Sequence, residues 1–257
     1  ASSLAANTTG YNNTAVGNAA LRTNTTGAAN TAVGSLSLDA NTTGGENTAV
    51  GYKSLSANTT GTANTVMGYA ALDANTTASN NTAIGRAALG ATTTGTQNTA
   101  VGSLAGQTLT DADYNIAIGY SALSADTLGS RSVAVGRAAL QVQNFTSATN
   151  TYNTAVGYGT GESVTTGTLN TLIGGLAGDA ITTGQANTAL GYRSLSATTT
   201  AASNTAIGVD SLTSNTTGTS NTAVGRDTLN QQTTASYNTA LGHQALNLNT
   251  SGNSNTA

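Results

Sequence analysis

The sequence contains no cysteine, no proline and no tryptophan among its 257 residues. Without cysteine, neither disulfide bonds nor cysteine-ligated zinc can hold the chain together. Charged residues make up only 7% of the chain and aromatic residues only 4%, with one phenylalanine and one histidine. Because large apolar side chains are this scarce, the composition argues against an ordinary globular core.

Charge and hydropathy exclude two classes of partner. The seven basic residues are scattered, and the formal net charge is −3 at pH 7. A nucleic-acid-binding protein needs a basic face that neutralises phosphates, so no nucleic acid is expected as a partner. No apolar run approaches the length that spans a bilayer, so membrane insertion is not expected. The chain begins and ends inside its repeat, and we interpret it as a segment of a longer fibrous protein.

The phrase Asn-Thr-Ala-Val-Gly and its variants recur along the whole chain. Successive first residues are 17 residues apart, except for a step of 21 between Ser132 and Asn153 that holds a four-residue insertion near residues 143–151. This period is too short for helical-hairpin or leucine-rich repeats. It predicts an all-β fold: a parallel β-solenoid with two short strands and two turns per coil, forming a single repeat domain over residues 1–257 with about 15 coils.

We number the positions of each coil from 0, set at this first residue. Position 3 is always apolar, and position 1 is Thr except at Ile116 and Val133. Side chains two residues apart share one face of a strand, so the sequence predicts that positions 1 and 3 form a buried face and that Ala at position 2 points the other way. Position 4 is always Gly, which predicts a positive φ or a close backbone approach.

Position 8 is predicted to be the second layer of a small core. It is Leu in 11 of the 14 complete coils and Gly in the other three, at Gly106, Gly161 and Gly178. In those coils we expect a shifted leucine, such as Leu104 or Leu176, to refill the same space. The following Asn-Thr-Thr-Gly stretch is predicted to turn the chain, because Asn and Gly accept left-handed backbone.

The first residue of the coil is Asn in every coil but one. Stacking of identical coils would align these residues into a ladder of side-chain amide hydrogen bonds, so we interpret them as structural. The predicted ladder contains Asn13, Asn30, Asn47, Asn64, Asn81, Asn98, Asn115, Asn153, Asn170, Asn187, Asn204, Asn221, Asn238 and Asn255.

A single coil of this composition is not expected to fold alone. Its Val and Leu contribute roughly 1.5–3 kcal/mol each when buried, whereas ordering each of its residues costs roughly 1–2 kcal/mol in backbone entropy. Stacking adds hydrogen bonds to the coils above and below. The apolar face of positions 1 and 3 still needs more cover than one chain supplies, so we predict a homotrimer around a common axis.

The repeat resembles two families of extracellular fibre. Asn115-Ile116-Ala117-Ile118-Gly119 and Ser132-Val133-Ala134-Val135-Gly136 resemble the head repeats of trimeric autotransporter adhesins, which are left-handed parallel β-rolls. The longer coil, with Asn-Thr-Thr-Gly and Ala87-Ala88-Leu89, is similar to the shaft repeats of bacteriophage tail fibres. Both resemblances imply an extracellular, trimeric, structural or adhesive fibre, either a virion tail fibre that presents a host-receptor-binding tip or a bacterial adhesin.

Two features are candidate contacts for a cell-surface glycan or protein receptor. Aromatic and basic residues recur at position 5, where they would form a row able to stack on sugars or pair with acidic groups: Tyr52, Tyr69, Arg86, Tyr120, Arg137, Tyr158, Tyr192, Arg226 and His243. Alternatively, these large residues simply cover a turn. The insertion holds Phe145, and a loop that projects from a smooth shaft is a natural contact point.

No pattern in the sequence predicts catalysis, a metal site or a cofactor. His243 has no second histidine or cysteine for zinc and no regular triad partners. Asp111 and Asp113 provide two carboxylates, fewer than the six to eight oxygen ligands of calcium. A polysaccharide hydrolase needs paired carboxylates, and the ten acidic residues are scattered. We therefore expect no enzyme.

Two non-enzymatic functions remain in competition. The first is a rigid fibre segment, in which fifteen coils at a strand spacing of ~4.8 Å would extend over roughly 70 Å. The second is an ice-binding solenoid, in which regular ranks of Thr order water. Burial of the Thr residues at position 1, as predicted above, weakens the second function.

Overall fold

The computed structural model describes residues 2–257, which form an all-β fold without helices. It is a parallel β-solenoid of about 13 turns with coils of about 17 residues, as the period predicts. Accordingly, none of residues 2–257 lies in a helix that is long and apolar enough to cross a membrane. The chain divides into two compact units, residues 2–130 with 146–149 and residues 131–145 with 150–257, and each is described by itself.

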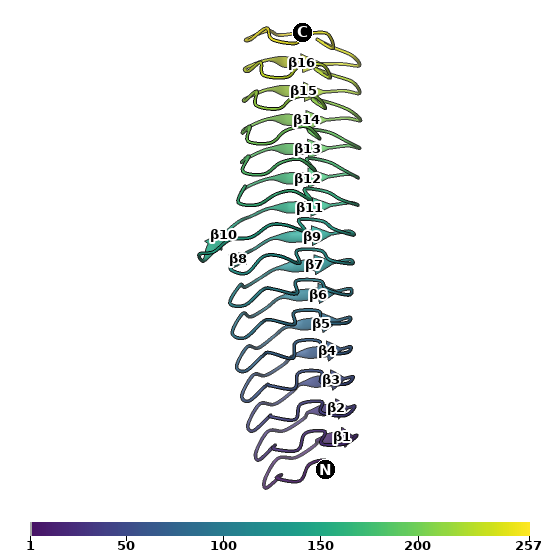
Figure 1. The fold of residues 1–257 in the computed structure, drawn as a ribbon, viewed down its shortest axis with the longest axis vertical. Coiled ribbons are helices and arrows are strands. Elements are labelled where there is room, and N and C mark those ends of the chain that lie inside the picture. The colour runs from purple at the N-terminus through teal and green to yellow at the C-terminus, as the bar shows by residue number, and fades with distance from the viewer. Residues whose placement is uncertain (1) are drawn as a thin grey trace. The chain divides into compact units, whose positions relative to one another are not determined.

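The first unit stacks three-residue strands in chain order, as Figure 1 shows in purple to teal. Neighbouring strands are parallel and offset by one coil, so that Thr14 pairs with Thr31 and Val16 with Val33. A short two-residue strand, β8 (Gly129–Ser130), comes after the last main strand of this unit. The main strands are β1 (Thr14–Val16), β2 (Thr31–Val33), β3 (Thr48–Val50), β4 (Thr65–Met67), β5 (Thr82–Ile84), β6 (Thr99–Val101) and β7 (Ile116–Ile118).

The second unit repeats this arrangement beyond the insertion. Thr154 pairs with Val133 in the register used elsewhere, so the four extra residues are accommodated in the loop without a register shift. The insertion contains the two-residue strand β10 (Thr149–Asn150). The main strands are β9 (Val133–Val135), β11 (Thr154–Val156), β12 (Thr171–Ile173), β13 (Thr188–Leu190), β14 (Thr205–Ile207), β15 (Thr222–Val224) and β16 (Thr239–Leu241).

Within the described chain, most coils contain one regular strand instead of the two that the period suggested, and only the coils that begin at Asn115 and Ser132 add a second, two-residue strand, β8 and β10. The reason lies in the backbone of the returning segment, where positions 6 and 8 have positive φ, as at Ala87 (52°) and Leu89 (52°). Left-handed residues interrupt an extended strand. Backbone hydrogen bonds between coils continue through this segment nevertheless, for example from the Leu89 N–H to the Ala105 carbonyl oxygen (3.0 Å).

Glycine at position 4 ends every strand for the two reasons that the sequence predicted. Gly85 has a φ of +134°, which L side chains rarely adopt. A Cβ atom on Gly85 would also lie only 2.4 Å from the carbonyl oxygen of Gly102, the equivalent residue of the next coil. The strand end is therefore a point where backbones of adjacent coils meet directly.

The predicted orientation of the strand faces was wrong for the single chain. Alanine at position 2 points into the coil and is fully buried, as at Ala32 and Ala83, whereas positions 1 and 3 point outward. The interior between the strand and the returning segment is narrow, so it takes Ala on one side and Leu on the other. The prediction for position 8 was correct, because Leu21, Leu89 and their equivalents are fully buried, except for Leu246 in the last complete coil, which is partly buried.

The three coils without leucine at position 8 fill the core from position 11. Leu109, Val164 and Ile181 occupy that position and are fully buried, while Leu104 and Leu176 stay only partly buried. A Cβ atom on Gly106 would lie 3.0 Å from Leu109 Cδ1. The expected refilling therefore occurs, but the residue that performs it is three positions after the glycine.

Buried asparagine amides form two columns within the coils. At position 0, the Asn47 N–H donates to Asn30 Oδ1 (3.0 Å), and Asn47 Nδ2 donates to the Gly61 carbonyl oxygen (2.9 Å). At position 11, Asn41 Nδ2 donates to Asn24 Oδ1 (2.8 Å). Asn24 was expected to turn the chain through left-handed backbone, but its φ is not positive, and its amide serves this second column instead.

Side chains of the insertion compensate for the missing asparagine at residue 132, where position 0 of the coil is a serine. Ser132 Oγ lies 2.6 Å from Thr151 Oγ1 and accepts a hydrogen bond from Gln143 Nε2 (2.9 Å). Gln143 Oε1 in turn accepts from Asn153 Nδ2 (2.8 Å). The shorter serine side chain is thus connected to the next coil by side chains of the loop.

Candidate functional site

One outward surface of each unit is its strand face, made by positions 1 and 3, which we call the sheet face. Position 1 presents Thr in most coils, and position 3 presents Val, Ile, Leu or Met throughout. Exposed apolar residues include Met67 (50%) and Leu190 (45%). Neither position carries a charged residue in any strand. A continuous uncharged and partly apolar face of this kind is typical of an interaction surface.

A second outward surface lies on the returning segment at positions 13 and 15, and we call it the Thr surface. Position 13 is exposed Thr in five consecutive coils of each unit: Thr26, Thr43, Thr60, Thr77 and Thr94, and Thr166, Thr183, Thr200, Thr217 and Thr234. Position 14, between the two columns, is a buried Gly or Ala. Position 15 is often Thr or Ser: Thr62, Ser79 and Thr96, and Thr168, Thr219 and Ser236.

The aromatic and basic residues of position 5 lie along one edge of each unit. In the first unit, the rings of Tyr52 and Tyr69 stack with centroids 5.5 Å apart, and Lys53 Nζ lies 5.7 Å from the Tyr52 centroid. In the second unit, Arg137 lies over the Tyr158 ring at 5.2 Å. Because these rings lie against their neighbours along the axis, their faces are partly covered, and the Tyr158 hydroxyl accepts a hydrogen bond from Arg137 Nη1 (3.0 Å).

The other members of this row differ in their partners. Arg226 Nε lies 3.2 Å from Asp227 Oδ2, and His243 Nε2 lies 3.9 Å from the same carboxylate oxygen. Arg226 and His243 are exposed and Asp227 is only partly buried, so the pairs contribute little to stability. Arg86, Tyr120 and Tyr192 are also exposed. The row therefore offers hydroxyl and cationic groups to solvent and does not form a cleft.

The candidate loop contact Phe145 is not available at the surface. Its side chain is only 6% exposed, so the ring packs inside while Thr146, Ser147 and Ala148 are exposed. Burial of a phenylalanine side chain stabilises the folded chain, whereas exposing the ring to water does not.

The acidic residues remain dispersed, as the sequence indicated. Asp111 accepts from Thr94 Oγ1 (2.5 Å) and Asp113 from the Thr96 N–H (2.6 Å), so both connect to the preceding coil. Within residues 2–257, no group of three or more histidine, cysteine, aspartate or glutamate residues is placed to hold a metal ion.

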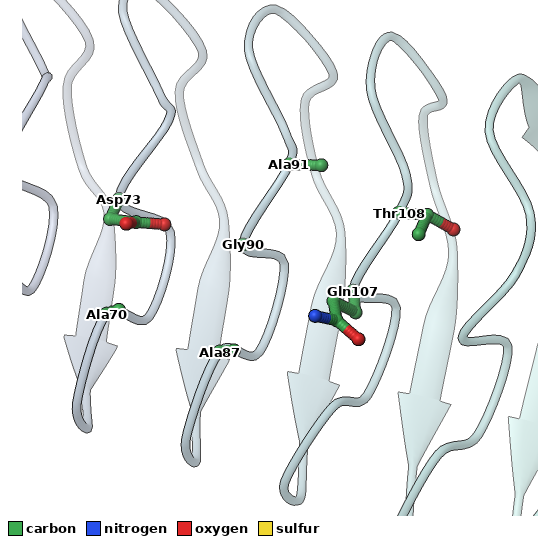
Figure 2. A pocket seen from close by; sticks show the side chains of 7 residues that line it. All are labelled: Ala70, Asp73, Ala87, Gly90, Ala91, Gln107 and Thr108. Atoms are coloured by element: carbon green, nitrogen blue, oxygen red, sulfur yellow. The ribbon is translucent and has the colours of Figure 1, made fainter.

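One shallow cavity of about 330 Å³ lies on the first unit (Figure 2). Its only ionisable side chain is Asp73, whose pKa is raised above 3.8 mainly by burial, against the opposing effects of a backbone hydrogen bond and the Lys53 charge. No second carboxylate, nucleophile or base faces it. The cavity is lined by small and polar residues of three successive coils: Ala70, Asp73, Ala87, Gly90, Ala91, Gln107 and Thr108.

No protein family, curated protein or solved structure matches this chain. The function is therefore argued from the two outward surfaces and the row at position 5. Of these, the sheet face is the one that carries an apolar residue in every complete coil.

Two features escaped the sequence reasoning. The Asn residues of position 11 were predicted to form a turn together with the Thr residues that follow them. Neither a second asparagine column nor an exposed Thr surface was predicted. The amino-acid sequence carries no signal that separates these positions from a turn, and burial in the structure distinguishes them. Within Asn58-Thr59-Thr60-Gly61-Thr62, the burial alternates so that Asn58 and Gly61 are inside and Thr60 and Thr62 are outside.

Proposed function

We propose that this chain is a segment of an extracellular structural and adhesive fibre, in which stacked coils hold a receptor-binding region at a distance. The observation that carries the proposal is the sheet face, which repeats without interruption along each unit and which one chain leaves open. In the closest functional analogy, the segment is part of a phage tail-fibre shaft. A bacterial surface adhesin head or an extracellular filament is the alternative.

We further propose that three copies cover their sheet faces by packing around a common axis, with each chain wound as a left-handed β-roll. The position 3 residues Val50, Ile84 and Val101 would then form a layered apolar core between chains. Burial of such side chains contributes roughly 1.5–3 kcal/mol each, and the contribution repeats in every coil. The Thr hydroxyls of position 1 would lie beside this core, where Ile116 and Val133 already replace them.

The row at position 5 lies outside the proposed core, and in this proposal it contacts a cell-surface glycan or protein receptor. Tyr120 and Tyr192 are about half exposed, at 52% and 50%. Tyrosine hydroxyls and arginine side chains are suited to polar and acidic groups of a polysaccharide.

A pair of single-cysteine variants tests the arrangement of the chains, since the chain has no cysteine of its own. Val101→Cys on the sheet face is expected to give disulfide-linked chains on mild oxidation, because equivalent residues meet near the axis. Thr94→Cys on the Thr surface of the same unit serves as the matched control and should remain unlinked. Equal linking of both variants, or of neither, would contradict the proposed packing.

A charge on the sheet face gives an independent test. Ile84→Asp is expected to lower the molar mass in solution to that of one chain while the far-UV circular dichroism spectrum is retained, because position 3 points away from the core of its own coil. Electron micrographs of the unaltered segment should show rods. Compact particles would argue against a fibre of any kind.

A further inference from the structure

The position 13 column of the Thr surface presents hydroxyl groups that bond to no other described residue, apart from that of Thr94, which donates to Asp111. The position 15 hydroxyls of Thr62, Thr96, Thr168 and Thr219 bond to the next coil. Among residues 2–257, the Oγ1 atoms of Thr26, Thr43, Thr60 and Thr77 make no hydrogen bond to another residue, although their neighbours in the coil are extensively bonded. Consecutive coils of a parallel stack repeat at about 4.8 Å. Each unit therefore presents a column of methyl-bearing hydroxyls at position 13, with four free hydroxyls in succession in the first unit.

The backbone beneath this column is held firmly in register. The hydroxyl of Thr42 donates to the Thr59 carbonyl oxygen (3.0 Å), and that of Thr59 donates to the Thr76 carbonyl oxygen (2.9 Å). At position 15, Ser79 Oγ accepts from the Thr62 N–H (3.0 Å). Since threonine is also restricted at χ1, little conformational entropy remains to be lost when an ordered partner binds.

The residue types of the Thr surface exclude several classes of partner. Neither column carries a charge between Thr26 and Thr96 or between Thr166 and Ser236, so a polyanion finds no cation there. The two columns contain no aromatic ring for a sugar and no large apolar side chain to anchor a protein. A rigid, uncharged, periodic set of hydroxyl and methyl groups fits a partner that is itself an uncharged periodic array of hydrogen-bond donors and acceptors.

We propose that the Thr surface binds ice. Its hydroxyls would take the places of water molecules at the crystal surface, and the threonine methyl groups would hold the intervening waters in position. The inference is independent of the fibre proposal, because positions 13 and 15 belong to the returning segment and not to the sheet face. It also moves the ice-binding function from position 1, where the sequence had suggested it, to a different set of threonines.

The test is thermal hysteresis of the segment, measured by osmometry over a concentration series, together with incorporation of fluorescently labelled protein into a growing ice crystal. We expect a hysteresis gap that widens with concentration, and labelled ice. Replacing Thr43, Thr60, Thr77, Thr183, Thr200 and Thr217 with Asp should abolish both signals. The fold is expected to tolerate these changes, because Asp111 occupies position 13 in its own coil.

A matched control alters the sheet face instead. Thr→Val at positions 48, 65, 82, 188, 205 and 222 should leave hysteresis unchanged, since Val133 occupies this position naturally. If the Asp variant does not fold, a second variant replaces it, in which the six position 13 residues (Thr43, Thr60, Thr77, Thr183, Thr200 and Thr217) are changed to Leu. Leucine is tolerated at position 13, because Leu128 occupies it in its own coil. Hysteresis no greater than that of serum albumin at equal concentration overturns the proposal. A folded Asp or Leu variant that retains thermal hysteresis also overturns the proposal. The oligomeric state of the protein does not enter into either of these outcomes.

Discussion

The core of a coil is filled either by a leucine at position 8 or by an apolar residue at position 11. Variants that convert one arrangement into the other should show that the effects of positions 8 and 11 on the free energy of unfolding are strongly coupled. The coil that begins at Asn98 has Gly106 and Leu109 at these positions, where the common coil has Leu and Asn. A Cβ atom on Gly106 would lie 2.9 Å from Leu89 Cδ2 and 3.0 Å from Leu109 Cδ1. Gly106→Leu alone therefore overpacks the core, which typically costs ~1–3 kcal/mol.

Leu109→Asn alone should be destabilising for the opposite reason. Leu109 is fully buried, and removal of a buried leucine costs ~2–5 kcal/mol. In the double variant the leucine at position 106 fills the space that residue 109 vacates, and the new amide can donate to the Ala112 carbonyl oxygen as Asn75 does to Ala78 in its own coil. We expect most of the combined loss, about 3–8 kcal/mol for independent changes, to be recovered.

The assay is guanidinium unfolding of the two single variants and the double variant, followed by far-UV circular dichroism and analysed as a double-mutant cycle. Gly106→Leu combined with Ile181→Asn in the other unit is the matched control, and its effects should add. A double variant of Gly106 and Leu109 that is as unstable as the sum of the single variants would refute the proposed exchange of volume.

Three further variants test the backbone, the amide column and the carboxylates. Gly85→Ala should lower the melting temperature markedly, because the new methyl group meets the Gly102 carbonyl oxygen at 2.4 Å in a backbone conformation with φ +134°. Asn47→Ala should cost ~1–3 kcal/mol, chiefly because the buried Asn64 N–H loses its acceptor, as measured by guanidinium unfolding. Asp179→Asn should stabilise the protein at pH 7: burial raises the pKa of this carboxyl above 3.8, so its charged form costs stability at higher pH, and the gain should vanish below pH 3.8.

Each of these variants has a control in the same chain. Gly90→Ala should be mild, since its φ is not positive and the nearest atom to the new methyl group is 3.3 Å away. Asn18→Ala removes an exposed amide at a residue whose φ is not positive, and should change stability little. Asp111→Asn should not give the stabilisation at pH 7 that we expect of Asp179→Asn, because Asp111 is exposed. Equal effects in a variant and its control would contradict the corresponding argument.

The period alone was sufficient to predict the architecture, because 17 residues per coil leave few alternatives to a β-solenoid. The glycine at position 4 and the leucine at position 8 were also predicted with their correct roles. Each has a physical reason that the residue type itself indicates. Gly85 is required by its positive φ and by the close approach of the Gly102 carbonyl oxygen, and Leu89 is a large apolar side chain that gains by burial.

The orientation of the strand was not predictable in the same way. Position 3 is apolar and position 2 is alanine, so hydrophobicity alone favours burial of Val50 over burial of Ala49, yet Ala49 is the residue that is buried. The width of the coil decides the matter, and width depends on the left-handed residues of the returning segment. These are ordinary residues such as Ala87 and Lys53, which carry no sequence signal for positive φ.

The candidate surfaces were predicted to different extents. The row at position 5 was visible because tyrosine and arginine are rare in this chain, and the structure places those residues on one edge of each unit. The Thr surface was not visible, since threonine is common at several positions and only burial distinguishes Thr60, which is exposed, from Thr59, whose hydroxyl bonds to the next coil.

The most direct test of the fibre proposal is the molar mass of the segment in solution, measured by light scattering coupled to size-exclusion chromatography. One chain has a mass of 25.1 kDa. If three chains cover their sheet faces together, the measured mass will be close to three times that value and will fall to 25.1 kDa in the Ile84→Asp variant. A mass of 25.1 kDa for the unaltered segment at all concentrations would show that the sheet face stays open and would contradict the trimeric fibre.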